Sequence, residues 1–283
     1  MHTRDPQDES GPLPEALRQA IRGTADDIAA LLRSAPGTAG AVPGSQWTVG
    51  EAAAHLAMAN ELMADLAAGH ERPYGDGTPQ SLAPANARAL AAFGERRAEP
   101  LAAMITEQAG VFLAAVDRAD TEAGDAESTG APTPITPLGP MNRAVLASYL
   151  LTHMLGHGYD LARAVRRPHM IDGDRVGLCM PFMLSVMPRV ADPAATARLT
   201  ARFAVRLRGG GTVFGVDLAG GAVAVTEGEP ERPDCTLLID PVAFLLIALG
   251  RRNPWVAIAR GQVFAQGRKP WLGPRFPALF TAP

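Results

Sequence analysis

Three of the six histidines stand where their imidazoles could bind one metal ion. His153 and His157 lie four residues apart in an apolar, helix-forming stretch, so both side chains leave one face of a helix about one turn apart. His55 lies in another such stretch, where helical periodicity places it on the same face as Ala52 and Leu62. Three inward nitrogen donors leave one position of a tetrahedral ion open, which is typical of a catalytic zinc site.

The histidine pattern also has less specific explanations. Two histidines four residues apart occur by chance on many helices, and a single interior histidine is more often a hydrogen-bonded core residue. The same spacing occurs in zinc proteases, but Met154 stands where those enzymes carry their general-base glutamate. The spacing therefore indicates a metal site without establishing one, and it argues against that class of protease.

Four long helices are predicted to carry or support these residues. Apolar positions recur with helical period over residues 14–34, 48–69, 84–119 and 141–165, and a further helix is predicted over 173–190. Thr48 and Glu51 form a capping-box sequence at the second helix, and Pro100 should kink or split the third. Residues 120–140 have the composition of a surface loop. Long helices joined by loops that can reverse the chain predict an up-and-down type bundle.

The pattern changes after Asp192-Pro193, where short alternating or β-branched runs replace the helical period. Strands are predicted over 200–207, 211–218, 221–226, 235–240 and 261–266, and short helices over 241–249, 255–260 and near 271–280. These elements predict an α+β domain. The expected organisation is a disordered arm over 1–13, a helical bundle with the metal site over 14–192, and the α+β domain over 193–283.

The composition restricts the class of protein. A chain of 283 residues, 47% of them hydrophobic, can fill the cores of two domains. The formal net charge of −3 and the lack of a long basic run argue against a nucleic-acid partner. No apolar run is long enough to span a bilayer and the N-terminus lacks an apolar signal segment, so a cytoplasmic protein with no membrane partner is expected.

The cysteines and the basic residues add two further indications. Cys179 and Cys235 form no CxxC pair, so the sequence supports neither a disulfide framework nor a thiolate metal site. Lys269 is the only lysine, and alanine, glycine and proline are abundant. This bias is typical of a high-GC bacterial genome of actinobacterial type.

Two segments resemble the DinB-like superfamily, in particular its mycothiol-dependent maleylpyruvate isomerase branch. Residues 47–56, WTVGEAAAHL, resemble the motif in which a Trp-Thr start leads into a helix with a zinc-ligand histidine. Residues 153–160, HMLGHGYD, resemble the second motif, in which two ligands four residues apart precede an aromatic-Asp pair. By this resemblance His55, His153 and His157 correspond to the metal ligands. The isomerase usually has glutamate in place of His153, whereas other DinB-like proteins, including thiol S-transferases, have histidine there.

The resemblance continues beyond the bundle. Residues from about 196 to 283, including Leu238-Ile239-Asp240-Pro241, resemble the sterol-carrier-protein-2-like (SCP2-like) domain that follows the bundle in this branch. The resemblance thus implies a DinB-like four-helix bundle followed by a small SCP2-like α+β domain. It implies zinc as the divalent metal and mycothiol as a thiol cosubstrate. The implied activity is that of a transferase or isomerase that adds the thiol to a small electrophile.

Other residues are weaker candidates for the site. Asp160 follows His153 by seven residues and could orient a ligand imidazole, although a solvated aspartate explains it equally well. Arg260 and Arg268 could bind a carboxylate of the substrate or the thiol, against the simpler explanation of solvated arginines. No catalytic residue besides the metal ligands is identified.

Two other functions are compatible with the sequence. The protein could be a non-catalytic carrier whose SCP2-like domain binds an apolar ligand and whose histidines hold a structural metal. It could also be a thiol-independent enzyme of secondary metabolism on the same fold. An inward triad with an open coordination position favours catalysis over the carrier.

Overall fold

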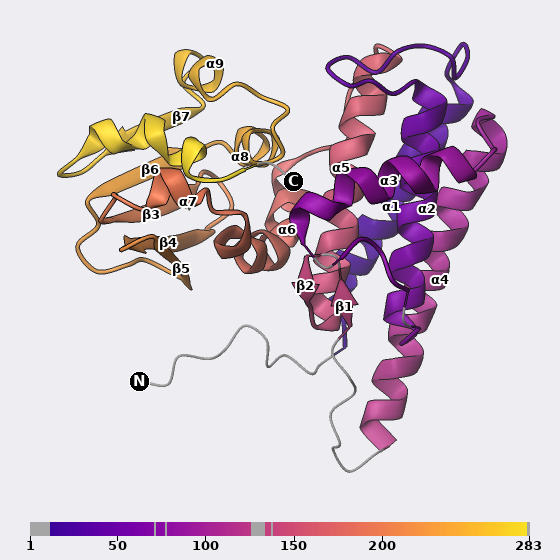
Figure 1. The fold of residues 1–283 in the computed structure, drawn as a ribbon, viewed down its shortest axis with the longest axis horizontal. Coiled ribbons are helices and arrows are strands. Elements are labelled where there is room, and N and C mark those ends of the chain that lie inside the picture. The colour runs from indigo at the N-terminus through magenta and orange to yellow at the C-terminus, as the bar shows by residue number, and fades with distance from the viewer. Residues whose placement is uncertain (1–11, 71, 77, 126–133, 137, 282–283) are drawn as a thin grey trace. The chain divides into compact units, whose positions relative to one another are not determined.

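The computed structural model describes residues 12–70, 72–76, 78–125, 134–136 and 138–281. The chain divides into two compact units, one that ends at Met170 and one that begins at Ile171. The first unit is helical and the second is built on a five-stranded sheet (Figure 1). The predicted disordered arm lies outside the described residues except for Pro12 and Leu13, and Leu13 is buried.

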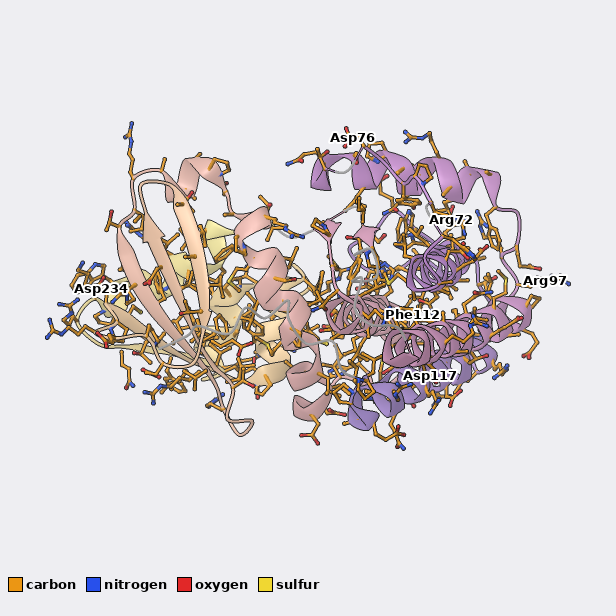
Figure 2. All side chains as sticks on the ribbon, turned by 90° about the horizontal axis from the view of Figure 1, so that it is seen from below. Arg72, Asp76, Arg97, Phe112, Asp117 and Asp234 are labelled. Carbon is orange, nitrogen blue, oxygen red and sulfur yellow. The ribbon has the colours of Figure 1, made fainter. Side chains whose placement is uncertain are left out.

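The helical unit contains α1 (Glu15–Arg33), α2 (Val49–Ala67), α3 (Pro79–Ala92), α4 (Ala98–Asp125) and α5 (Arg143–Ala164). A short hairpin of β1 (Ile135–Thr136) and β2 (Gly139–Pro140) precedes α5 in the region predicted as loop. Helices α1 and α2 both pack on α4 and on α5, so α1 and α2 are diagonal in the bundle. In a simple up-and-down bundle, helices that follow one another along the chain are neighbours, so this bundle differs from that arrangement. The long connection over 34–48 allows the chain to cross the end of the bundle between α1 and α2. Phe112 of α4 is fully buried in its core (Figure 2).

Side-chain caps fix where the two histidine-bearing helices begin. The Thr48 hydroxyl accepts from the Glu51 amide at 3.2 Å and the Glu51 carboxylate accepts from the Thr48 amide at 2.8 Å, which confirms the predicted capping box. The Thr48 amide and the Thr48 hydroxyl, which donates to the same carboxylate at 2.9 Å, lower the pKa of Glu51. Asn142 caps α5, since its side-chain oxygen accepts from the Val145 amide at 2.8 Å.

The predicted third helix is two helices, α3 and α4, with a turn over 93–97. The break precedes Pro100, which lies in the first turn of α4, where a proline removes no helical hydrogen bond. Arg96 holds the turn by donating to backbone carbonyl oxygens in the turn and at the end of α3. Gly50 of α2 lets the turn approach, because a Cβ there would lie 2.9 Å from the Arg96 carbonyl oxygen. Helix α4 also continues to Asp125, beyond its predicted end at 119.

The second unit begins with α6 (Gly173–Val186), the 3-10 helix η1 (Met187–Val190) and α7 (Pro193–Thr196). Its strands are β3 (Ala201–Leu207), β4 (Val213–Ala219), β5 (Ala222–Glu227), β6 (Cys235–Ile239) and β7 (Val263–Gln266), in the order β5-β4-β3-β6-β7. Strands β3 and β6 are parallel and the other neighbours are antiparallel. The remaining elements are α8 (Pro241–Ala248), α9 (Pro254–Ala259) and the 3-10 helix η2 (Pro270–Leu279). All five predicted strands are thus present, with ends that differ by at most two residues.

The division between the units lies earlier than the expected boundary at 192. Helix α6 belongs to the second unit, where it packs on α8. Its side chains Phe182, Met183 and Val186 line a cavity of that unit. The helical period of α6 made it resemble part of the bundle, because periodicity identifies an apolar face but not the element that covers it. In the described part of the chain, no helix is long and apolar enough to cross a membrane.

Candidate metal centre

His55 of α2 and His153 and His157 of α5 come together within the helical unit. The Nε2 atoms of His55 and His153 are 3.2 Å apart, and one ring nitrogen of each residue lies within 4.8 Å of the other two. Two nitrogens bound to one tetrahedral zinc at Zn–N distances of about 2.0–2.1 Å would be about 3.3 Å apart. The separation of the first pair fits a shared ion, so the donor set and its geometry suit zinc.

The orientation of the three rings supports the same conclusion. Their centroids are 4.6–5.1 Å apart and their planes are inclined by 58–74°. The i,i+4 spacing on α5 brings His153 and His157 together, and the packing of α2 on α5 adds His55. His55 is only 5% exposed, and the other two are half-buried. The site is therefore sheltered, with two of its three histidines partly exposed.

Trp47 covers one side of the histidines. Its indole centroid is 4.8 Å from that of His55 and 6.0 Å from that of His157. Trp47 immediately precedes the capping residue Thr48, so the cap that starts α2 also places the indole. In the sequence analysis Trp47 appears only as part of a motif. Its contact with two candidate ligands makes it an apolar wall of the site.

Asp160 lies beside the imidazole of His157. The distance from its Oδ2 to His157 Nδ1 is 3.7 Å, and each side chain is 14% exposed. This is longer than a direct hydrogen bond, but a carboxylate on the Nδ1 side favours the tautomer that offers Nε2 to a metal. The location agrees with the orienting role considered from the sequence, and the role itself remains a prediction.

We expect Asp160→Asn to weaken zinc binding by about 10–100-fold, because an amide stabilises the required tautomer less well than a carboxylate. Competition with a chromogenic chelator measures the affinity. Asp26→Asn is a matched control, since Asp26 is an exposed carboxylate on α1 of the same unit. Equal zinc affinities in the two variants would contradict the role of Asp160.

A tyrosine that the sequence analysis missed lies one helical turn before His153. The ring of Tyr149 meets that of His153 edge-on, with centroids 6.2 Å apart. Burial, assisted by the nearby Tyr74, raises the pKa of the Tyr149 hydroxyl to about 12. The hydroxyl of Tyr74 donates to Asn86 Oδ1 at 2.5 Å. The four-residue spacing between Tyr149 and His153 was the sequence signal that could have identified this residue.

The two candidate anion-binding arginines belong to the second unit. Arg268 donates to Asp234 Oδ1 at 2.7 Å, and Lys269 binds the same oxygen at 3.2 Å (Figure 2 labels Asp234). A substrate carboxylate would have to compete with Asp234 for Arg268. Arg260 follows the last residue of α9 and is exposed. Participation of Arg260 or Arg268 in the metal site remains a prediction.

The second unit contains an apolar cavity of about 550 Å³. Elements α6, β6, α8, α9 and η2 all contribute to its wall, with side chains that include Phe182, Leu237, Phe244, Ile258 and Phe276. A few polar residues, among them Arg252 and Asn253, complete the lining. A largely apolar cavity of this size can hold an apolar small molecule.

Residues 186–268 match the SCP-2 sterol transfer family. This part of the chain is an SCP2 domain. The match covers all five strands of the sheet and the helices α8 and α9, which form part of the cavity wall. The SCP2-like domain expected from the sequence is therefore confirmed, and its cavity lies within the second unit. A search of curated protein sequences gave no significant match.

Solved structures extend the comparison to both units. A histidine-to-alanine mutant of the mycothiol-dependent maleylpyruvate isomerase aligns with a TM-score of 0.51 at 12% identity, over 90% of this chain and 93% of that one. A second structure of that isomerase aligns over the same shares at 14% identity, with a TM-score of 0.44. A sterol carrier protein 2 structure covers 30% of this chain and 74% of its own, at 25% identity and a TM-score of 0.25. The first alignment confirms the predicted fold, a helical bundle followed by an α+β domain, and the family match identifies the second part as an SCP2 domain.

Proposed function

We propose that this protein is a zinc-dependent enzyme that uses mycothiol to modify a small electrophile, by S-transfer or by isomerisation. The observation that carries the proposal is the convergence of the ring nitrogens of His55, His153 and His157. Within the described residues the cluster includes no fourth His, Cys, Asp or Glu. A three-histidine set therefore leaves a coordination position for an exchangeable ligand. The fold shared with a mycothiol-dependent isomerase supports a thiol as that ligand.

The residues of the site have distinct roles in this proposal. The three imidazoles would hold the ion, which when bound lowers the pKa of a coordinated thiol so that a thiolate nucleophile is present at neutral pH. Trp47 excludes water on one side of the histidines. Tyr149 packs its ring edge-on against the imidazole of His153. We place the reaction in the cytoplasm, where low-molecular-weight thiols stay reduced.

Both candidate reactions begin with the formation of a carbon–sulfur bond. The thiolate sulfur adds to an electrophilic carbon, and the displaced electron pair moves onto the substrate. In S-transfer the carbon–sulfur bond remains in the product, and the electron pair departs with the halide of an aryl halide or takes up a proton from water as the alkoxide of an opened epoxide. In isomerisation the adduct rotates about the former C=C bond and then expels the thiolate unchanged. The fate of the thiol therefore distinguishes the two activities.

Turnover by full-length protein should require both the thiol and the metal. The experiment incubates the protein with maleylpyruvate, and separately with a panel of aryl halides and epoxides, with and without mycothiol. We expect consumption only with mycothiol, loss after treatment with a chelator, and recovery when zinc is added. Regenerated mycothiol would identify an isomerase and a stable thioether an S-transferase. Equal consumption without the thiol would contradict the proposal and favour a thiol-independent enzyme.

The apolar cavity of the SCP2 domain supports a second candidate function, the binding of an apolar ligand. Titration of the full-length protein with a fluorescent fatty acid tests this function. Saturable binding that persists after metal removal would assign ligand binding to the SCP2 domain. If such binding occurred and no substrate of the panel were consumed with or without the thiol, the carrier function would be favoured over the enzyme.

A further inference from the structure

Residues 241–283 contain no acidic residue, although the whole chain has a formal net charge of −3. The same segment contains six basic residues, which are Arg251, Arg252, Arg260, Arg268, Lys269 and Arg275. This segment includes α8, α9, β7 and η2. Positive charge is therefore concentrated on one part of the SCP2 domain, which favours contact with an anionic partner.

The same part of the chain exposes large apolar side chains. Of the six large hydrophobic residues that are exposed among the described residues, four lie within 255–271. These are Trp255, Val256, Phe264 and Trp271, and the two tryptophans are 63% and 64% exposed. Since α9, β7 and η2 pack on one another, the four side chains come from adjoining elements. Exposed apolar side chains that are grouped in this way indicate an interaction surface.

Basic and aromatic groups alternate around the end of α9. The ring of Phe264 lies against Gly261, where a Cβ would be 3.5 Å from it, and Arg260 immediately precedes this glycine. The guanidinium carbon of Arg208 is 5.7 Å from the centroid of the Phe264 ring. Within the described residues Arg208, Arg260 and Arg275 form no ion pair, whereas Arg268 and Lys269 share Asp234. At least three cations are thus not neutralised by a carboxylate.

Helix α9 connects this surface to the apolar cavity. Ile258 lines the cavity, whereas Trp255 and Val256 on the same helix are exposed to solvent. Nucleic acid would be attracted by the charge, but contact with a phosphate backbone does not require outward-facing indoles and a valine. A lipid bilayer offers both an anionic surface and an apolar phase in which these side chains can be buried.

We propose that α9, β7 and η2 form a docking surface for an anionic lipid bilayer, with Trp255 and Trp271 entering the headgroup layer. Tryptophan is enriched at this depth, because its ring is largely apolar and its N–H can bond to water or headgroups. The unpaired arginines face the lipid phosphates and strengthen binding to anionic leaflets. The sequence predicted no membrane partner because it lacks a spanning segment, but peripheral docking requires none. This inference does not depend on the proposed enzymatic function.

Flotation of full-length protein with lipid vesicles tests the proposal. The protein should bind vesicles of phosphatidylcholine mixed with phosphatidylglycerol at least about tenfold more tightly than vesicles of phosphatidylcholine alone. High salt should remove this difference in affinity. Trp255→Ala and Arg260→Glu should each weaken binding to the anionic vesicles by about tenfold. Ile135→Ala and Arg118→Glu are matched controls, because both residues are exposed and lie in the helical unit. These controls should bind as the unaltered protein does.

Three results would overturn the proposal. The first is an absence of preference for anionic vesicles. The second is an equal loss of binding in the two test variants and their controls, which would locate docking elsewhere. The third is tight binding of an unrelated RNA that Arg260→Glu weakens while vesicle binding is absent, which would make this a nucleic-acid surface. Circular dichroism should be the same for all variants, since every substituted side chain is exposed.

Discussion

Purified full-length protein should carry about one divalent metal ion per chain after mild dialysis, whereas the variant His55→Ala/His153→Ala/His157→Ala should carry almost none. The expectation rests on the 3.2 Å separation of the Nε2 atoms of His55 and His153 and on the approach of His157 within 4.8 Å of both. Elemental analysis by mass spectrometry gives the metal content directly. His70→Ala is the control. His70 is exposed and follows the C-terminal end of α2, where its imidazole lies near Asp65. Equal metal content in the triple variant and the control would refute the site.

Single substitutions of His153 refine this expectation. His153→Glu should keep most of the metal, because a carboxylate oxygen binds zinc at a similar distance and the resemblance of residues 153–160 to the isomerase motif implies a glutamate at this position. His153→Ala should lose most of it, since two imidazoles hold zinc much more weakly than three. If both variants were equally free of metal, the correspondence of His153 with that glutamate would be wrong.

A fragment of residues 1–170 should fold by itself and bind metal as the full chain does, whereas a fragment of residues 1–192 should aggregate. All three histidines precede Met170, which ends the helical unit. The longer fragment adds α6 without α8, so the apolar side chains Phe182 and Val186 would lose the domain whose cavity they line. An exposed apolar helix face of this kind promotes association. Gel filtration, circular dichroism and metal analysis of both fragments provide the comparison.

The opposite outcome would also be informative. If the fragment of residues 1–192 were monomeric and more stable to urea than the shorter one, α6 would stabilise the bundle. The boundary expected from the sequence would then be correct, and the division at Met170 would not describe an independent folding unit. The full-length protein serves as the reference for metal content and helical signal in both cases.

The sequence by itself determined most of the elements and the identity of the candidate ligands. Thr48 with Glu51 marks the start of α2 through hydrogen bonds made within one helical turn, so no distant residue is needed to predict it. The strands follow from side-chain alternation and from the glycines between them. His153 and His157 share a helix face because four residues span about one turn. These features depend on short stretches of chain, where local geometry decides.

Only the tertiary structure decided which faces meet. The turn at 93–97 forms before Pro100 because Arg96 holds carbonyl oxygens there and Gly50 of another helix leaves room for it. Trp47 comes to lie against His55 and His157 through the docking of α2 on α5, which no local pattern specifies. Helix α6 shows the same limit, since its period marks an apolar face that either domain could cover. Periodicity identifies what must be buried, whereas the partner depends on the shape and packing of residues far apart in the chain.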